Sequence, residues 1–234
     1  MPTVSVVLPT YNERDNIGPL IQALLAHVRE PVEVWVVDDD SPDGTWQVVQ
    51  ALAERDPRVH LLRRVGERGL TSAIAAGIAA SCGEVVVWMD CDFSMPPEAV
   101  PRLVAALEGA EVAVGSRYVR GGRDVGHSWM ARAFSWTINR FASLLLGWGV
   151  RDYTSGFIAA RREVLERILL QGDYGEYCID LLYRAQRAGY RVVEIPYTCT
   201  ERASGESKTG AHVLDYLRRG WKYVWTVLRL RLGL

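Results

Sequence analysis

Two acidic side chains one residue apart, Asp90 and Asp92, follow a short apolar stretch at residues 85–89. The stretch is too short for a helix and rich in β-branched residues, which is typical of a buried strand. Ligands bind at the carboxyl ends of strands in a parallel sheet, where these carboxylates would stand. Hard oxygen ligands at this spacing can hold a divalent cation and leave positions open for phosphates and water. The pattern indicates a metal-diphosphate site, although a bare Asp-x-Asp is more often a pair of solvated loop aspartates.

Polar groups also follow two earlier strand-like stretches. Tyr11 and Glu13 come after the apolar run at residues 4–8, and Asp39 comes after the run at 32–37. Loops at strand ends are often polar, so one such loop would mean little. Three of them at one edge of a parallel sheet indicate a site for a base, a ribose and a metal-bound diphosphate.

These groups must be positioned by alternating strands and helices. The sequence predicts an α/β fold with an open, mostly parallel sheet and helices on both faces, because strand-like and helix-like stretches alternate from residue 4 to residue 114. Asn12 or Asp15 is the expected cap of the first helix. The expected strands cover residues 4–8, 32–37, 59–62, 85–89 and 112–114. The first helix is expected to end near residue 28, and three further helices are expected over residues 45–55, 70–81 and 97–107.

Composition excludes several classes of protein. A formal net charge of -1 does not point to nucleic acid. The 4 cysteines lack zinc-binding spacing and fit a reducing cytoplasm. We find no signal peptide and no uncharged apolar run of about 18 residues. The dinucleotide fingerprint, the P-loop and the hydrolase nucleophile elbow are all missing from the sequence.

Several longer motifs resemble those of one enzyme family. The chain resembles the inverting glycosyltransferases of the GT-A fold, and among them the dolichyl- or polyprenyl-phosphate mannosyltransferases. The motifs occur in the family's order from about residue 4 to 210, and they are Pro9-Thr10-Tyr11-Asn12-Glu13, the run from Val37 to Thr45, Met89-Asp90-Cys91-Asp92, Gly115-Ser116-Arg117-Tyr118 with Gly121-Gly122, Thr154-Ser155-Gly156-Phe157, and Arg202 through Ser207-Lys208.

The resemblance implies a role for each matching residue. Arg132 and Ser135 would hold the acceptor phosphate, and Arg117 would contact phosphate. Ser94 stands where the family often has a Gln ligand to the metal, and it is a weaker ligand that would act directly or through water. Asp90 and Asp92 would bind Mg²⁺ or Mn²⁺ with the diphosphate. The nucleotide would be held by Pro9, Tyr11, Glu13, Asp39, Asp90, Cys91, Arg117, Arg202 and Lys208, the last two on a loop that closes over the donor.

A lipid monophosphate acceptor needs no general base. Its second pKa is about 6, so it is largely dianionic at neutral pH. We therefore assign no role to any of the 4 histidines. The expected catalytic residues are Asp92, Arg117, Arg132, Ser135 and Arg202, because guanidinium groups can hold two mutually repelling anions while one in-line displacement inverts the anomeric carbon.

Two amphipathic stretches, residues 129–148 and 211–234, combine Trp and Leu with Arg. Such helices can lie in a lipid interface, or they can pack on the domain as most amphipathic helices do. A small membrane subunit is a third way to reach a lipid acceptor. We expect a glycosyltransferase domain at residues 1–210, a C-terminal amphipathic helix at 211–234, and a peripheral location at the cytoplasmic face of a membrane.

The predicted reaction is transfer of mannose from GDP-mannose to dolichyl or polyprenyl phosphate. A rival hypothesis keeps the fold and uses another donor, such as UDP-glucose. A second rival replaces the lipid with a soluble sugar or a protein as acceptor, and a third makes the chain a non-catalytic subunit that binds a nucleotide sugar. Intact Asp90, Asp92, Arg117 and Arg202 argue against the non-catalytic subunit.

Overall fold

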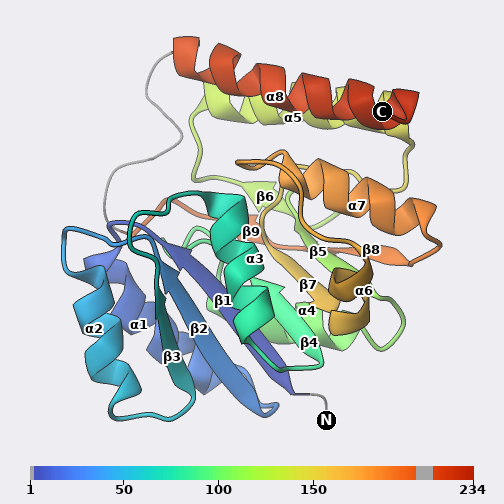
Figure 1. Cartoon of the computed structure of the whole chain (residues 1–234). Coiled ribbons are helices and arrows are strands. Elements are labelled where there is room, and N and C mark those ends of the chain that lie inside the picture. The colour runs from blue at the N-terminus through green and yellow to red at the C-terminus, as the bar shows by residue number, and fades with distance from the viewer. Residues whose placement is uncertain (1–2, 204–212) are drawn as a thin grey trace.

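The computed structural model describes residues 3–203 and 213–234, with side chains placed over residues 3–203 and 220–234. At its centre is a seven-stranded sheet in the order β3-β2-β1-β4-β7-β5-β8 (Figure 1). β7 runs antiparallel to β4 and β5, and the other neighbouring strands run parallel. The predicted open, mostly parallel sheet is confirmed. The strands are β1 (Val4–Thr10), β2 (Val32–Asp38), β3 (Val59–Arg63), β4 (Val85–Trp88), β5 (Val112–Ser116), β7 (Ile158–Arg161) and β8 (Val192–Pro196).

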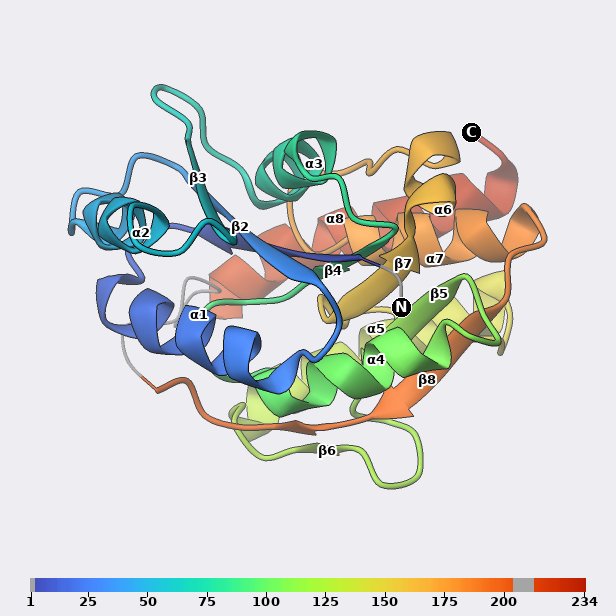
Figure 2. The same cartoon turned by 90° about the horizontal axis from the view of Figure 1, so that it is seen from below.

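Helices cover both faces of the sheet (Figure 2). Alternate side chains of a strand point to opposite faces, so Val6 and Leu8 of β1 pack with α1, α2 and α4, whereas Val7 packs with the helices of the other face. The helices are α1 (Arg14–His27), α2 (Thr45–Ala53), α3 (Leu70–Ala80), α4 (Val100–Ala106), α5 (Trp129–Leu146), α6 (Arg162–Arg167), α7 (Tyr177–Arg187) and α8 (Val213–Leu232).

One expectation about local structure was wrong, and one needs refinement. Glu13 is the N-cap residue of α1, with no side-chain cap, instead of Asn12 or Asp15. Asn12 has a φ of 55° and lies in the preceding turn. The hydrogen bond from the Asn12 backbone amide to Ser41 Oγ holds the backbone of this turn in place. The single helix expected over residues 97–107 is a 3-10 turn, η1 (Pro97–Ala99), followed by α4.

A second, two-stranded sheet stands beside the main one. It pairs β6 (Arg123–Asp124) with β9 (Thr198–Cys199) in parallel. No sequence pattern predicted it, because neither strand exceeds two residues.

Helices α5 and α8 lie side by side along one end of the molecule (Figure 1). The Phe134 and Tyr223 rings meet edge to face at 6.4 Å between centroids, and a Cβ on Gly220 would lie 2.9 Å from the Phe134 ring. Each helix therefore packs one face on the protein, as the second interpretation of these stretches expected. Within the described part of the chain, no helix has the length and apolar character needed to span a bilayer.

Candidate active site

A pocket of about 590 Å³ opens at the carboxyl ends of β1, β2 and β4. Most of the residues singled out from the sequence meet here, although they come from distant parts of the chain. Those that line it are Pro9, Tyr11, Glu13, Asp39, Asp90, Cys91, Asp92, Ser94, Arg117, Ser135 and Arg202. Lys208 lies outside the described residues.

Asp39 sits in one corner of the pocket and is held by a residue that the sequence reasoning missed. Arg64 Nε donates to Asp39 Oδ1 at 2.7 Å, and the Gly69 amide donates to Oδ2 at 2.9 Å. Both Asp39 and Arg64 are buried. Nearby, the Arg68 guanidinium lies 3.6 Å from the centroid of the Tyr11 ring. The corner thus combines a carboxylate that is ion-paired with Arg64 and an aromatic ring that is covered by the Arg68 guanidinium, which suits recognition of a polar heterocycle.

Asp92 is the buried member of the acidic pair. Its Oδ1 accepts from the Ser94 amide at 3.0 Å, and its Oδ2 accepts from Arg202 Nη2 at 2.6 Å. Burial opposes ionisation, yet the hydrogen bonds from Ser94 and the charge of Arg202 hold the pKa of the Asp92 carboxyl below its ordinary value. Asp92 is therefore a carboxylate at neutral pH.

The acidic pair suits a hard divalent cation. Asp90 is exposed at the pocket and stands two residues from the ionised Asp92. The Cys91 thiol between them donates to the Pro9 carbonyl at 3.5 Å, which links the ends of β4 and β1. Two carboxylates with space for diphosphate and water are the donor set that Mg²⁺ or Mn²⁺ uses with nucleotides.

Arg117 lies in one wall of the pocket and forms a dense set of hydrogen bonds; we call this residue and its partners the Arg117 wall. Its Nε and Nη2 donate to the two oxygens of Asp152 at 2.9 and 2.8 Å. Nη2 also donates to Thr154 Oγ1 at 2.9 Å and Ser135 Oγ at 3.3 Å, and Nη1 lies 3.4 Å from Asp124 Oδ2. Burial works against the charge, but Asp152 raises the pKa of Arg117 well above its ordinary value. The residue is a fixed cation that joins α5 to the loop before β7.

Sequence reasoning missed Asp152 and Asn139, which hold this arrangement in place. Asp152 is completely buried. Asn139 Nδ2 donates to Thr154 Oγ1 at 2.9 Å, and the Tyr153 amide donates to Asn139 Oδ1 at 2.6 Å. The Thr154-Ser155-Gly156-Phe157 motif was a signal for this loop, and Asp152 two residues earlier could have been included with it.

The structure separates the two residues assigned to the acceptor phosphate. Ser135 lines the pocket and shares a 2.9 Å hydrogen bond with Thr154 Oγ1. Arg132, one turn earlier on α5, is exposed and does not line the pocket. Its Nη1 donates to the backbone carbonyl of Asp124 at 3.1 Å. Arg132 thus lies at the outer edge of the wall to which Ser135 belongs.

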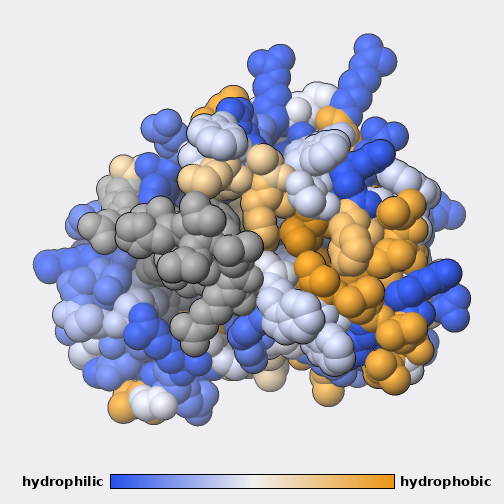
Figure 3. Space-filling view, turned by 90° about the horizontal axis from the view of Figure 1, so that it is seen from above, coloured by the Kyte–Doolittle hydropathy of each residue, from blue (hydrophilic) through white to orange (hydrophobic). Residues whose placement is uncertain are grey.

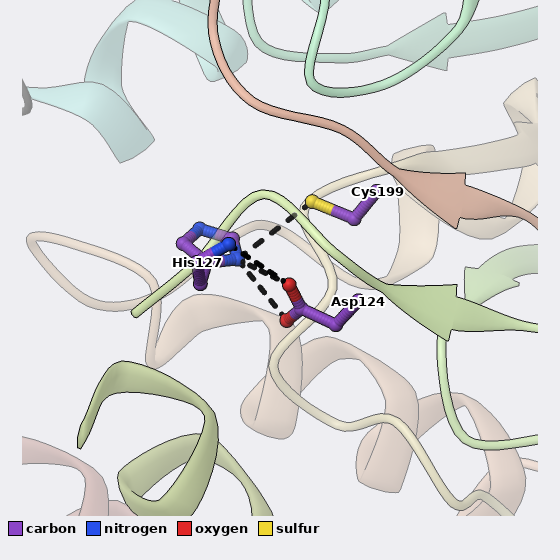
Figure 4. Close-up of side chains that lie close together, drawn as sticks. All are labelled: Asp124, His127 and Cys199. Carbon is purple, nitrogen blue, oxygen red and sulfur yellow. Dashed lines mark hydrogen bonds and ion pairs between the residues drawn. The ribbon is translucent and has the colours of Figure 1, made fainter. Parts of the chain in front are cut away.

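His127 also lines the pocket, although no histidine was assigned a role. Its Nδ1 lies 3.0 Å from Asp124 Oδ1 and 3.7 Å from Cys199 Sγ (Figure 4). The hydrogen bond with Asp124 is the main reason that the pKa of His127 is raised to about 10. The sequence offered a His three residues after an Asp, but its closeness to Cys199 depends on the pairing of β6 with β9.

An apolar, aromatic surface is exposed on α5 and α8, close to the pocket wall. Figure 3 shows orange side chains gathered on the part of this face that grey atoms do not cover. Arg140 lies 4.7 Å from the Trp148 ring centroid, so cations are interspersed with the aromatic rings. The exposed large side chains of these helices and the adjoining loop are Trp129, Met130, Trp136, Leu144, Trp148, Trp221, Trp225 and Leu232.

Comparison with known proteins assigns this chain to a family. The family model described as "Glycosyl transferase family 2" matches residues 5–169. The polyprenol monophosphomannose synthase of Mycolicibacterium smegmatis is 46% identical over 219 residues, which cover 90% of this chain and 82% of that protein. The undecaprenyl-phosphate mannosyltransferase of Micrococcus luteus is 37% identical over 99% of both chains. The dolichol-phosphate mannosyltransferase of Pyrococcus furiosus is 38% identical, and the match spans 62% of that longer protein.

Solved structures of similar fold include a glucosyl-3-phosphoglycerate synthase of Mycobacterium tuberculosis in complex with Mn²⁺, UDP and glucosyl-3-phosphoglycerate. It superposes with a TM-score of 0.73 at 25% sequence identity and covers 100% of this chain and 81% of that chain. The sheet and its covering helices are therefore those of a GT-A-like fold.

Proposed function

Because this chain belongs to glycosyl transferase family 2 and is a glycosyltransferase, we propose that it transfers mannose from GDP-mannose to a polyprenyl or dolichyl phosphate with inversion. The observation that carries the proposal is a single pocket that joins the Asp90–Asp92 pair to the Arg117 wall, next to an exposed aromatic surface. Curated relatives at 37% to 46% identity bear names that describe this kind of transfer.

On the donor side, we assign the nucleoside to the corner formed by Tyr11, Glu13 and Asp39, and the diphosphate to the acidic pair. Asp90 and Asp92 would hold Mg²⁺ or Mn²⁺, with Ser94 close by. The metal, when bound, stabilises the negative charge that develops on the departing diphosphate. Arg202, already paired with Asp92, is close enough to add a second positive charge there.

On the acceptor side, the attacking group is a phosphate oxygen that is already ionised near neutral pH. The chain therefore needs to position this anion and not to deprotonate it. Arg117 and Ser135 at the pocket wall support that task, with Arg132 at its outer edge. The oxygen attacks the anomeric carbon as the bond to the diphosphate breaks, so the product has inverted configuration.

We propose that the aromatic surface of α5 and α8 contacts the membrane in which the acceptor resides. Trp221 and Trp225 are 63% and 51% exposed and stack at 6.3 Å between centroids. Tryptophan favours the interfacial region of a bilayer. A small membrane subunit covering the same surface would be an alternative partner.

Replacing Trp221 and Trp225 together with Ser should weaken binding to anionic phospholipid vesicles by about tenfold or more, because two interfacial rings are lost. Vesicle flotation measures the bound fraction. Trp46→Ser is the matched control, since Trp46 lies on α2, which packs against β3 at the opposite edge of the sheet. Equal binding by the double variant and the wild type would rule out this surface as the membrane contact.

Transfer of radiolabelled sugar into an organic-extractable lipid tests the reaction itself. GDP-mannose and UDP-glucose are offered in parallel with a short polyprenyl phosphate and Mg²⁺ or Mn²⁺. We expect label in the lipid from GDP-mannose, and loss of transfer when EDTA removes the metal. Label from UDP-glucose alone would replace the donor and keep the mechanism.

A second candidate is glucosyl transfer to a small phosphorylated acceptor. The structural likeness to the glucosyl-3-phosphoglycerate synthase favours it. Incubation of UDP-glucose with 3-phosphoglycerate, followed by detection of a water-soluble labelled product, distinguishes it from lipid transfer. Nucleotide binding without either product would favour a non-catalytic subunit.

A further inference from the structure

The Asp124–His127–Cys199 cluster brings a carboxylate, an imidazole and a thiol together beside the pocket (Figure 4). One ligand atom from each residue lies within 4.8 Å of the other two. Asp124 Oδ1 and Cys199 Sγ both face the same ring nitrogen of His127, Nδ1. A catalytic relay would use one ring nitrogen for each neighbour, so this arrangement is not a nucleophile–base–acid triad. Three different ligand atoms that converge on one region are instead typical of a metal site.

The backbone fixes this convergence. Asp124 and Cys199 are paired residues in the parallel ladder of β6 and β9. The amides of Val125 and Gly126 both donate to the Cys199 carbonyl, at 2.9 and 3.1 Å. A Cβ on Gly126 would lie 1.9 Å from the Thr200 carbonyl oxygen, so only glycine allows the two segments to cross this closely. The next residue is His127, which the crossing sets against Cys199.

Arg117 does not use up the carboxylate of this cluster. Its Nη1 lies 3.4 Å from Asp124 Oδ2 and contacts only that oxygen. Both carboxylate oxygens face His127, with Oδ1 and Oδ2 at 3.0 and 3.1 Å from Nδ1, and Oδ1 also accepts from the His127 backbone amide at 3.2 Å. A metal ion could therefore be bound through Oδ1 while Oδ2 keeps its ion pair. The side chain of Asp124 is 6% exposed and that of His127 is 47% exposed. The cluster is therefore anchored by a buried carboxylate and can be reached from solvent at the imidazole.

We propose that Asp124, His127 and Cys199 bind a divalent metal ion of the zinc class, at a site separate from the Asp90–Asp92 pair. A thiolate and an imidazole select Zn²⁺ over Mg²⁺, which prefers oxygen ligands. Binding releases the Cys199 thiol proton and the Nδ1 proton to solvent. Three protein ligands leave a fourth tetrahedral position for water or for a group from the pocket, which His127 and Cys199 both line. This site is not part of the proposed sugar transfer, so its test does not depend on that reaction.

Cobalt substitution tests the site directly. The full chain is treated with a chelator, reduced, and titrated with Co²⁺ while its absorption spectrum is recorded. We expect a thiolate-to-cobalt charge-transfer band in the near ultraviolet that saturates at one equivalent, and its loss in the presence of Zn²⁺. Cys199→Ser should abolish the band, and His127→Gln should weaken Co²⁺ binding by about tenfold or more. Circular dichroism checks that both variants are folded.

Two matched variants separate this site from the other thiols and from the acidic pair. Cys82→Ser removes an exposed cysteine elsewhere on the chain and should leave the band unchanged. Asp90→Asn should also leave it unchanged, although Cys91 is adjacent. A wild-type chain with no charge-transfer band would overturn the proposal, and so would a band that survives in folded Cys199→Ser.

Discussion

Replacing Asp92 with asparagine should lower kcat/KM for the nucleotide sugar by about a thousandfold or more. Asparagine keeps the size of the side chain and can still accept the Ser94 amide hydrogen bond at Oδ1. It removes the negative charge that would hold the metal and that now pairs with Arg202. The loss therefore falls on diphosphate activation and not on folding. Initial rates of lipid glycosylation at saturating acceptor measure the effect.

Asp40→Asn is the control for this variant. Asp40 belongs to the same acidic sheet edge, but it is outside the pocket lining and pairs with Arg63 on the surface. Asn also tolerates the φ of 54° at this position. We expect near wild-type rates from Asp40→Asn. Full turnover by a folded Asp92→Asn enzyme would mean that Asp92 does not hold the metal.

The strand ends and their acids could be predicted from the sequence because the signals are local. A buried parallel strand is a run of apolar residues, and the edge at which it ends follows from the direction of the chain. Pro9, Asp39 and Asp92 all line the predicted pocket for this reason. The alternation of strands and helices in the first half of the chain left few other topologies.

The Arg117 wall could not be predicted in the same way. Its main partner, Asp152, is 35 residues away and joins it through the loop before β7. β7 is inserted antiparallel between β4 and β5, an arrangement for which its short Ile-Ala-Ala-Arg sequence offers no signal. Motif matching predicted that Arg117 contacts phosphate, but it could not show that the guanidinium is buried and already bonded to four side chains.

The amphipathic helices illustrate a different limit. The same Trp and Leu periodicity predicts packing on protein or contact with lipid. In the structure it serves packing first, because Phe134 meets Tyr223, while Trp136 and Trp221 stay exposed. Only the way in which α5 pairs with α8 decides which face of each helix is left outside, and that pairing is not encoded in either stretch alone.

Replacing Arg117 with leucine should lower the free energy of unfolding by about 3–5 kcal/mol, because Asp152 would be left buried without its cation. Asp152 is completely buried and accepts two hydrogen bonds from the Arg117 side chain. Urea unfolding followed by circular dichroism measures the change. Activity should fall as well, but the loss of stability is the distinguishing result, since a purely phosphate-binding arginine on the surface would cost little.

Arg58→Leu is a matched control for burial. Arg58 also donates two hydrogen bonds to one aspartate, Asp56, at 3.0 and 2.7 Å, but that pair is at the surface. Its loss should change stability by no more than about 1 kcal/mol. Combining Arg117→Leu with Asp152→Asn should restore part of the stability lost by Arg117→Leu alone, because the unpaired buried charge is then removed. If the double variant is destabilised by the sum of the two single changes, Asp152 is not the reason that Arg117 is needed for folding.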